Sequence, residues 1–158
     1  MSDRSKKLAE RLNSFNEELI SLVRNCTEVD WQKIGLEEWP IGVTARHIGA
    51  NHYAAIAAAK KILKGEKFPE MTMDQITEMA NRHAREHADC TKSEVLDILR
   101  DQGRSVIEFA RGLEDSELDK TAYLPALGSD ITVEQFLENV ILHGANQHFQ
   151  SMKSAVGR

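Results

Sequence analysis

The chain has 158 residues, with 20 lysines and arginines against 25 aspartates and glutamates, so its formal net charge is −5. This length is typical of one domain, and we expect a single domain over residues 1–158. The apolar fraction of 41% favours a folded chain over a disordered one. Acidic and basic residues alternate without forming a basic stripe, which argues against nucleic acid as a partner.

Two stretches lack charged side chains, residues 47–59 and 139–152, and both are shorter than the ~20 apolar residues that cross a bilayer. We therefore expect no membrane association. The first residues run directly into a charged amphipathic pattern without an apolar leader, which predicts a cytoplasmic protein. The spacing of Cys26 and Cys90 suits neither a zinc ribbon nor a redox pair, so we interpret both as idle thiols.

Apolar residues recur at helical spacing in the first segment, which predicts a helix from about Ser5 to Cys26. Its expected buried stripe comprises Leu8, Leu12, Phe15, Leu19, Leu22 and Cys26. A loop should follow over residues 27–42. A second helix is expected from Ala45 to Lys64, with Thr44 as its N-cap.

Capping signals predict the later helices. A third helical stretch is expected over residues 72–88. The boxes that begin at Thr91 and Thr132, with Glu or Gln three residues later, predict helices that run to about residues 112 and 155. The intervening residues 114–128 should form a loop because they contain proline and glycine.

Four long helical patterns without an alternating strand predict an all-α fold, with an up-down four-helix bundle as the default architecture. The short helix within residues 74–88 would be an extra element in the middle connection. It would act as a lid or pack across the bundle. One alternative is an interaction or regulatory module that uses residues 66–88 as a mobile lid.

The six histidines occur in three pairs. His83 and His87 are four positions apart, a spacing that lets two imidazoles on one helical face bind one metal. Their neighbours are heavily charged, which favours a surface role instead. His47 and His143 each follow apolar residues on a predicted helical face, where an inward-facing histidine on each of two helices could contribute to a metal site.

His148 lies five positions after His143, which corresponds to a rotation of about 140° in a regular helix. Both side chains can face one point only if the helix is distorted. A π-bulge would correct the register, and Gly144 makes local irregularity less costly. Gln147 is the alternative partner of His143 on the same helical face.

Two segments resemble the DinB-like family. The run Glu38-Trp-Pro-Ile-Gly-Val-Thr-Ala-Arg-His-Ile resembles the opening of that family's second helix, which carries a metal ligand. The run from Thr132 through His148 to Met152 is similar to the family's last helix, where a His-x-x-x-His or Glu-x-x-x-His pair completes a three-ligand site. The resemblance covers nearly the whole chain.

By this resemblance, His47 and His148 carry over as metal ligands, and His143 would replace the ligand that the family has at position 144. The family implies a four-helix bundle, a homodimer, and a divalent ion, nickel or zinc, with an open coordination position. Members of the family include thiol-dependent isomerases and transferases, so the resemblance also implies an activity of this kind. A bound water or low-molecular-weight thiol would lose its proton more easily beside such an ion.

Two hypotheses of function follow. The first is a metal-dependent transferase, isomerase or hydrolase that acts on a small molecule, with His47, His143 and His148 as ligands. Asn51, His52 and Gln147 are then candidates for outer contacts or substrate binding, and Tyr53 lies near the same end. The second is a non-catalytic bundle with a degenerate metal site, which serves in ligand binding or dimerisation.

Overall fold

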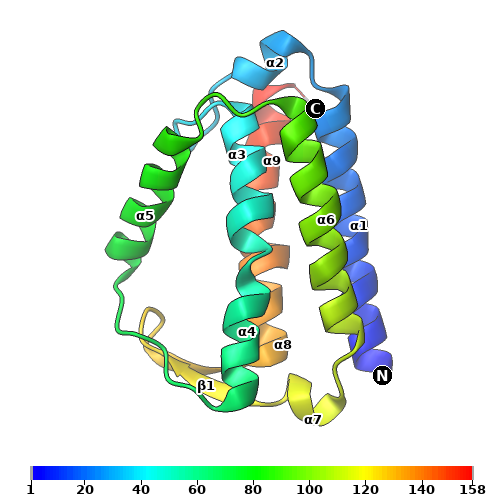
Figure 1. Ribbon diagram of the computed structural model, residues 1–158, viewed down its shortest axis with the longest axis vertical. Coiled ribbons are helices and arrows are strands. Elements are labelled where there is room, and N and C mark those ends of the chain that lie inside the picture. The colour runs from blue at the N-terminus through cyan, green and yellow to red at the C-terminus, as the bar shows by residue number, and fades with distance from the viewer. Residues whose placement is uncertain (1, 158) are drawn as a thin grey trace.

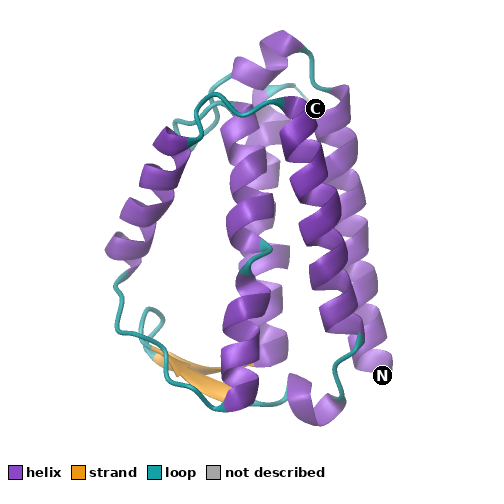
Figure 2. Ribbon diagram, in the orientation of Figure 1, coloured by secondary structure: helices purple, strands orange, loops and turns teal. Residues whose placement is uncertain are grey.

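The computed structural model describes residues 2–157, and most of them are helical (Figures 1 and 2). Among these residues, no helix is both long and apolar enough to cross a membrane. The elements in chain order are α1 (Asp3–Asn25), α2 (Glu28–Gln32), α3 (Ile41–His47), the π-helical segment η1 (Ile48–His52), α4 (Ala55–Lys64), α5 (Met73–Glu86), α6 (Lys92–Arg111), α7 (Asp115–Leu118), β1 (Thr121–Leu124), β2 (Ser129–Thr132), α8 (Val133–Leu137), the π-helical segment η2 (Glu138–Ala145) and α9 (Asn146–Ala155).

Four long arms form the predicted bundle: α1, the α3–η1–α4 arm, α6, and the α8–η2–α9 arm (Figure 1). Helix α5 stands to one side and carries the chain back along the length of the molecule. As a result, α6 runs in the same direction as α3 and α4, and α1 and the last arm run the opposite way. The all-α bundle is confirmed, and its order of directions differs from a simple up-down succession.

The predicted stripe of α1 is buried, because an amphipathic helix places residues three and four positions apart on the face that it packs against its neighbours. Leu8, Leu12 and Leu19 are 0–2% exposed. The capping boxes at Thr91 and Thr132 are confirmed, since each threonine side chain accepts a hydrogen bond from the backbone three residues later. A further box at Thr72 opens α5.

The second arm begins four residues earlier than predicted, at Ile41, with Pro40 as its N-cap. Thr44 lies within the helix, where its hydroxyl donates to the carbonyl of Pro40 at 3.4 Å instead of capping a helix start. The predicted loop over residues 27–42 also contains α2, a single short helix that begins after a capping box at Thr27. Local hydrogen bonding of this kind competes with longer elements.

Residues 121–132 form a two-stranded antiparallel hairpin, so the expectation that the fold contains no strand was wrong. Thr121 pairs with Thr132, and Leu124 pairs with Ser129. Gly128 has a φ of 67°, a left-handed conformation that suits glycine and reverses the chain. Each strand has four residues and little burial, which leaves too short a pattern to distinguish it from a loop.

Candidate metal centre

Three histidines from two arms of the bundle converge at one point. His47 ends α3, His52 ends η1 and His148 lies on α9. One ring nitrogen from each lies within 4.8 Å of the others. The centroids of the three imidazoles are 4.9, 5.0 and 5.1 Å apart, close to an equilateral triangle.

The π-helical segment η1 places His52 on the same face as His47. Five positions in a regular α-helix would turn His52 by about 140° away from His47. Instead, the backbone N–H of Tyr53 donates to the carbonyl of Ile48 at 3.1 Å, a π-type bond that spans five residues. The wider turn brings the two imidazoles together.

Glycine at position 49 lets this widened turn lie close to α6. A Cβ atom there would meet Cγ2 of Ile98 at 2.7 Å and Cδ2 of Leu99 at 3.0 Å. The absence of a side chain therefore allows the distorted segment to pack against the neighbouring arm without moving it.

Gly144 makes room for the imidazole of His52. A Cβ atom at position 144 would lie 3.3 Å from Cε1 of His52 and 3.1 Å from the carbonyl oxygen of Asn139. The position that corresponds to a ligand in the resembled family thus has no side chain here, and the ring of His52 occupies the adjoining space from the opposite arm.

The structure does not bring His143 to this cluster. The expected π-helical segment is present, but it covers Glu138–Ala145 and ends before His148. His143 is exposed, and its Nδ1 lies 3.3 Å from Oδ1 of Asn139 on its own helix. The distortion therefore leaves His143 on the outer face, and only His148 of this pair reaches the centre.

The remaining candidates are also separated by the fold. Asn51 lines the cavity beside the histidines, whereas Gln147 is exposed and lies outside that lining. Tyr53 is 1% exposed and donates to Oδ1 of Asn16 at 2.7 Å. Its burial raises the pKa of the phenol. Tyr53 is therefore part of the core hydrogen-bond network.

Glu37 holds His148 in position. Its Oε2 lies 2.6 Å from Nδ1 of His148, and its Oε1 accepts a hydrogen bond from Ser151 at 2.6 Å. Burial alone would raise the pKa of Glu37, but these two hydrogen bonds, a backbone hydrogen bond and the charge interaction with His148 together outweigh it, and the pKa lies below its ordinary value. The ionised carboxylate keeps the proton of His148 on Nδ1, which leaves Nε2 with its lone pair.

The loop between α2 and α3 presents Glu37 and Trp39. The N–H of Gly35 donates to the carbonyl of Trp39 at 3.1 Å, and Glu38 adopts a left-handed φ of 65°. This tight turn directs Glu37 at α9. The indole of Trp39 stacks on His148 with centroids 6.0 Å apart and meets His47 edge-on at 5.0 Å.

His52 is oriented by the backbone. Its Nδ1 lies 2.7 Å from the carbonyl oxygen of Val140. Because a carbonyl only accepts, Nδ1 carries the proton and Nε2 is the free ligand atom. Burial lowers the pKa of His52 to about 4, although the bond to Val140 acts in the opposite direction.

His47 is kept neutral by its surroundings. Burial lowers its pKa to about 3, and repulsion from His52 and His148 adds to this effect. A metal binds neutral imidazole, so the low pKa values leave His47 and His52 ready to bind at neutral pH without losing a proton.

The histidine cluster opens into a cavity of about 780 Å³ between α5 and the bundle. Trp39, Asn51 and Val140 contribute to its inner side. Met73, Ile76 and Met79 of α5 contribute to its outer side. This volume falls within the range of small-molecule sites.

Two other places could be mistaken for the site. His83, Glu86 and His87 also bring three ligand atoms within 4.8 Å of one another, but they all belong to the last turn of α5 and its cap, and two of them are exposed.

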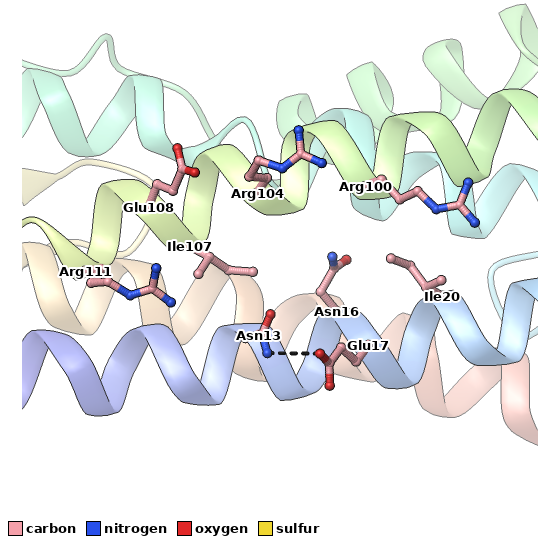
Figure 3. Close-up of a pocket in the computed structure, with 9 residues that line it drawn as sticks. All are labelled: Asn13, Asn16, Glu17, Ile20, Arg100, Arg104, Ile107, Glu108 and Arg111. Carbon is pink, nitrogen blue, oxygen red and sulfur yellow. Dashed lines mark hydrogen bonds between the residues drawn. The ribbon is translucent and has the colours of Figure 1, made fainter.

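A separate groove of about 320 Å³ lies between α1 and α6. Its lining residues, drawn in Figure 3, include three arginines and no histidine. It lacks the ligand types of a transition-metal site.

The donor set fits a divalent metal. Three imidazole nitrogens suit zinc or nickel, and two of them have their protons fixed on the distant ring nitrogen. The cavity adjoins all three histidines, so a fourth position would face the cavity. Three protein ligands with one open position are typical of catalytic rather than structural metal sites.

The protein is a four-helix bundle with a candidate metal centre, in which three histidines line one cavity. A family model described as the DinB superfamily matches residues 11–151. The chain therefore belongs to the DinB superfamily, as the resemblance of its second and last helices predicted.

Two solved structures share the fold. YfiT from Bacillus subtilis, described as a probable metal-dependent hydrolase with an unusual four-helix bundle topology, aligns with a TM-score of 0.76 and 19% identity over 99% of this chain and 90% of YfiT. An uncharacterized protein from Clostridium difficile 630 aligns with a TM-score of 0.73 and 16% identity, covering 98% of this chain and 96% of that one. No curated protein matched the sequence.

Sequence reasoning did not identify Glu37 as a partner of His148, and it placed His52 among the outer contacts. No periodicity marks Glu37, since it lies in an irregular loop. A signal for His52 was present, because it follows His47 by the same five positions that separate His143 from His148. The π-turn predicted for the later pair applies by the same spacing to the earlier pair.

Proposed function

We propose that the protein is a metal-dependent enzyme in which His47, His52 and His148 hold a divalent ion. The ion would activate water or a thiol for attack on a small-molecule substrate. The convergence of three imidazoles at one cavity carries this proposal. The name of YfiT supports hydrolysis, and the family resemblance supports thiol transfer or isomerisation. When bound, the ion would supply a Lewis acid beside the cavity.

The protein's own residues have three tasks in this scheme. Glu37 keeps the proton of His148 on Nδ1, and the carbonyl of Val140 does the same for His52. The side chain of Asn51 forms no hydrogen bond with the other described residues, so its amide is available to orient a polar group of the substrate. Helix α5 contributes an apolar wall on the outer side of the cavity.

The ligand set replaces His143, the sequence-based candidate, with His52. His143 contacts Asn139 on the outer face, whereas His52 adjoins Gly144 at the point where the family has a ligand. The missing side chain at position 144 therefore does not support the alternative of a degenerate site. Nickel or zinc as the ion, the use of a thiol and a homodimeric state remain predictions from the family.

A paired assay tests the activity. Protein loaded with zinc or nickel is given 4-nitrophenyl butyrate for hydrolysis, and cysteine with 1-chloro-2,4-dinitrobenzene for thiol transfer. We expect metal-dependent turnover in one of the two reactions, at least about 1000-fold lower in His52→Ala and unchanged in His143→Ala. Equal turnover by loaded and metal-free protein in both reactions would contradict a metal-dependent role.

A further inference from the structure

The cavity beside the histidine cluster has an apolar outer wall formed by one helix. Met73, Ile76 and Met79 of α5 line it, and they are 53%, 39% and 44% exposed. Exposed apolar side chains are ordinary when they are scattered. Here, three on one short helix adjoin the same cavity, which indicates a surface adapted to an apolar ligand.

The charged residues of the cavity lining also favour an uncharged ligand. Of the described residues that line it, none is a lysine or an arginine. Its carboxylate, Glu37, is already bonded to His148 and Ser151. In the metal-free protein, a carboxylate or phosphate on a ligand would lose its hydration and gain no lysine or arginine as a partner, which is costly in a partly buried site.

Helix α5 carries Arg82 and Arg85, but neither of them lines the cavity. Arg100, Arg104 and Arg111 project from α6 into the groove that faces α1 (Figure 3). The chain therefore separates an arginine-lined groove from a cavity without arginine or lysine, and the histidine cluster adjoins the latter.

We propose that the substrate is an uncharged, largely apolar small molecule whose one polar group faces the histidine cluster and Asn51. Its apolar body would lie against Met73, Ile76 and Met79. Flexible methionines adapt to ligands of different shape, which favours a class of related substrates over a single one. The placement of the reacting group rests on the proposed function, whereas the apolar selectivity rests on the cavity itself.

A matched pair of fluorescent probes tests this selectivity without a metal. N-phenyl-1-naphthylamine is neutral, and 8-anilino-1-naphthalenesulfonate has the same aromatic rings with an added sulfonate. We expect saturable binding of the neutral probe, with an affinity at least about tenfold higher than that of the anionic probe. Equal affinity for the two probes, or preference for the sulfonate, would overturn the proposal.

Variants locate the bound probe. The double variant Ile76→Asn/Met79→Gln removes much of the apolar wall and should weaken binding of the neutral probe about tenfold or more. Val29→Asn is the matched control, because Val29 is 72% exposed and lies outside the cavity lining. Unchanged binding of the neutral probe in the double variant would overturn the proposal. This holds also if the double variant changes its oligomeric state while its affinity for the probe stays the same.

A gain-of-binding variant separates charge from shape. Thr77 lines the cavity and is exposed, so Thr77→Lys should fold normally and add a cation. We expect it to raise the affinity for the sulfonate probe at least about fivefold and to leave the neutral probe unaffected. An unchanged affinity for the sulfonate would contradict the role assigned to charge. Since no step requires metal, these results are independent of whether the ion binds.

Discussion

The chain contains two groups of three candidate metal ligands, and they differ in how the fold supports them. His47, His52 and His148 come from two arms of the bundle, are partly buried and adjoin a cavity. The group that begins at His83 belongs to the end of α5 and is mostly exposed, and of its three members His83 alone lines the cavity. Both have their ligand atoms within 4.8 Å of one another.

The difference shows that ligand type and spacing are not sufficient to define a centre. In the buried group, a carboxylate and a carbonyl fix the rings of His148 and His52. In the exposed group, the ring of His87 contacts the carbonyl of His83 within the same helical turn. A site built on separate packed arms restricts its ligands before the metal arrives, which reduces the entropy lost on binding.

The largest expected contrast is in stabilisation by metal. Zinc at about 1000 times its dissociation constant should stabilise the protein by about 4 kcal/mol, or roughly 10 °C in Tm. His47→Ala should abolish this gain, whereas His87→Ala should retain it. Thermal unfolding with and without zinc measures both. An equal gain in the two variants would remove the distinction between the groups.

The next contrast concerns Glu37, whose carboxylate orients His148. In the exposed group, the ring of His87 contacts only a backbone carbonyl. Glu37→Gln should lower zinc affinity about 10–100-fold, because the amide no longer fixes the proton of His148 as an ionised carboxylate does. Glu38→Gln is the matched control, since Glu38 is the exposed neighbour. Calorimetric titration checks the prediction, and equal affinities in the two variants would contradict it.

A smaller effect is expected from the space beside His52. Gly144→Ala places a methyl group 3.3 Å from the ring and should lower zinc affinity about tenfold by displacing that ligand. Gly112→Ala is its control, because a Cβ there would have ordinary contacts, the nearest at 3.6 Å. If Gly144→Ala binds zinc as tightly as Gly112→Ala, His52 is not held by this contact.

The smallest effect is a pH dependence of the metal-free protein. The folded-state pKa of His52, about 4, lies below the ~6.5 of an unfolded histidine, so the unfolded chain binds more protons between these values. Stability should therefore fall as the pH drops below about 6.5. Between pH 7.5 and 5.5, His52 should contribute about 1 kcal/mol of this loss.

Urea unfolding at the two pH values measures this contribution. His52→Gln should lose about 1 kcal/mol less than the natural chain over the same interval. His143→Gln, which changes an exposed imidazole outside the cavity lining, is the control for the substitution. The same pH dependence in His52→Gln and the natural chain would show that His52 is not buried in its neutral form.

Much of the fold could be predicted because its signals are local and periodic. The stripe of α1 and the boxes at Thr91 and Thr132 are properties of consecutive residues, and the structure confirms them. The hairpin could not be predicted in this way, since strands of four residues with exposed side chains give little pattern. The return of the chain along α5 depends on packing that has no local sequence signal.

The site was partly predictable for a related reason. His47 was predicted from its helical face and from the family resemblance, whereas His148 was predicted from the resemblance alone. The presence of His52 in the histidine cluster, and the position of His143 outside it, depend on where two π-turns occur. These turns reflect packing between arms, such as the approach of Gly49 to α6. The role of Glu37 depends on a loop conformation that brings together residues more than 100 positions apart.

The most direct test of this account is the zinc content of three purified variants without a histidine tag, measured by elemental analysis after dialysis against limiting zinc. His87→Ala serves as the common background so that the exposed group does not contribute. We expect about one ion per chain in this background and with His143→Ala added, and none with His52→Ala added. Zinc that is retained in the His52 variant and lost in the His143 variant would contradict the assigned centre.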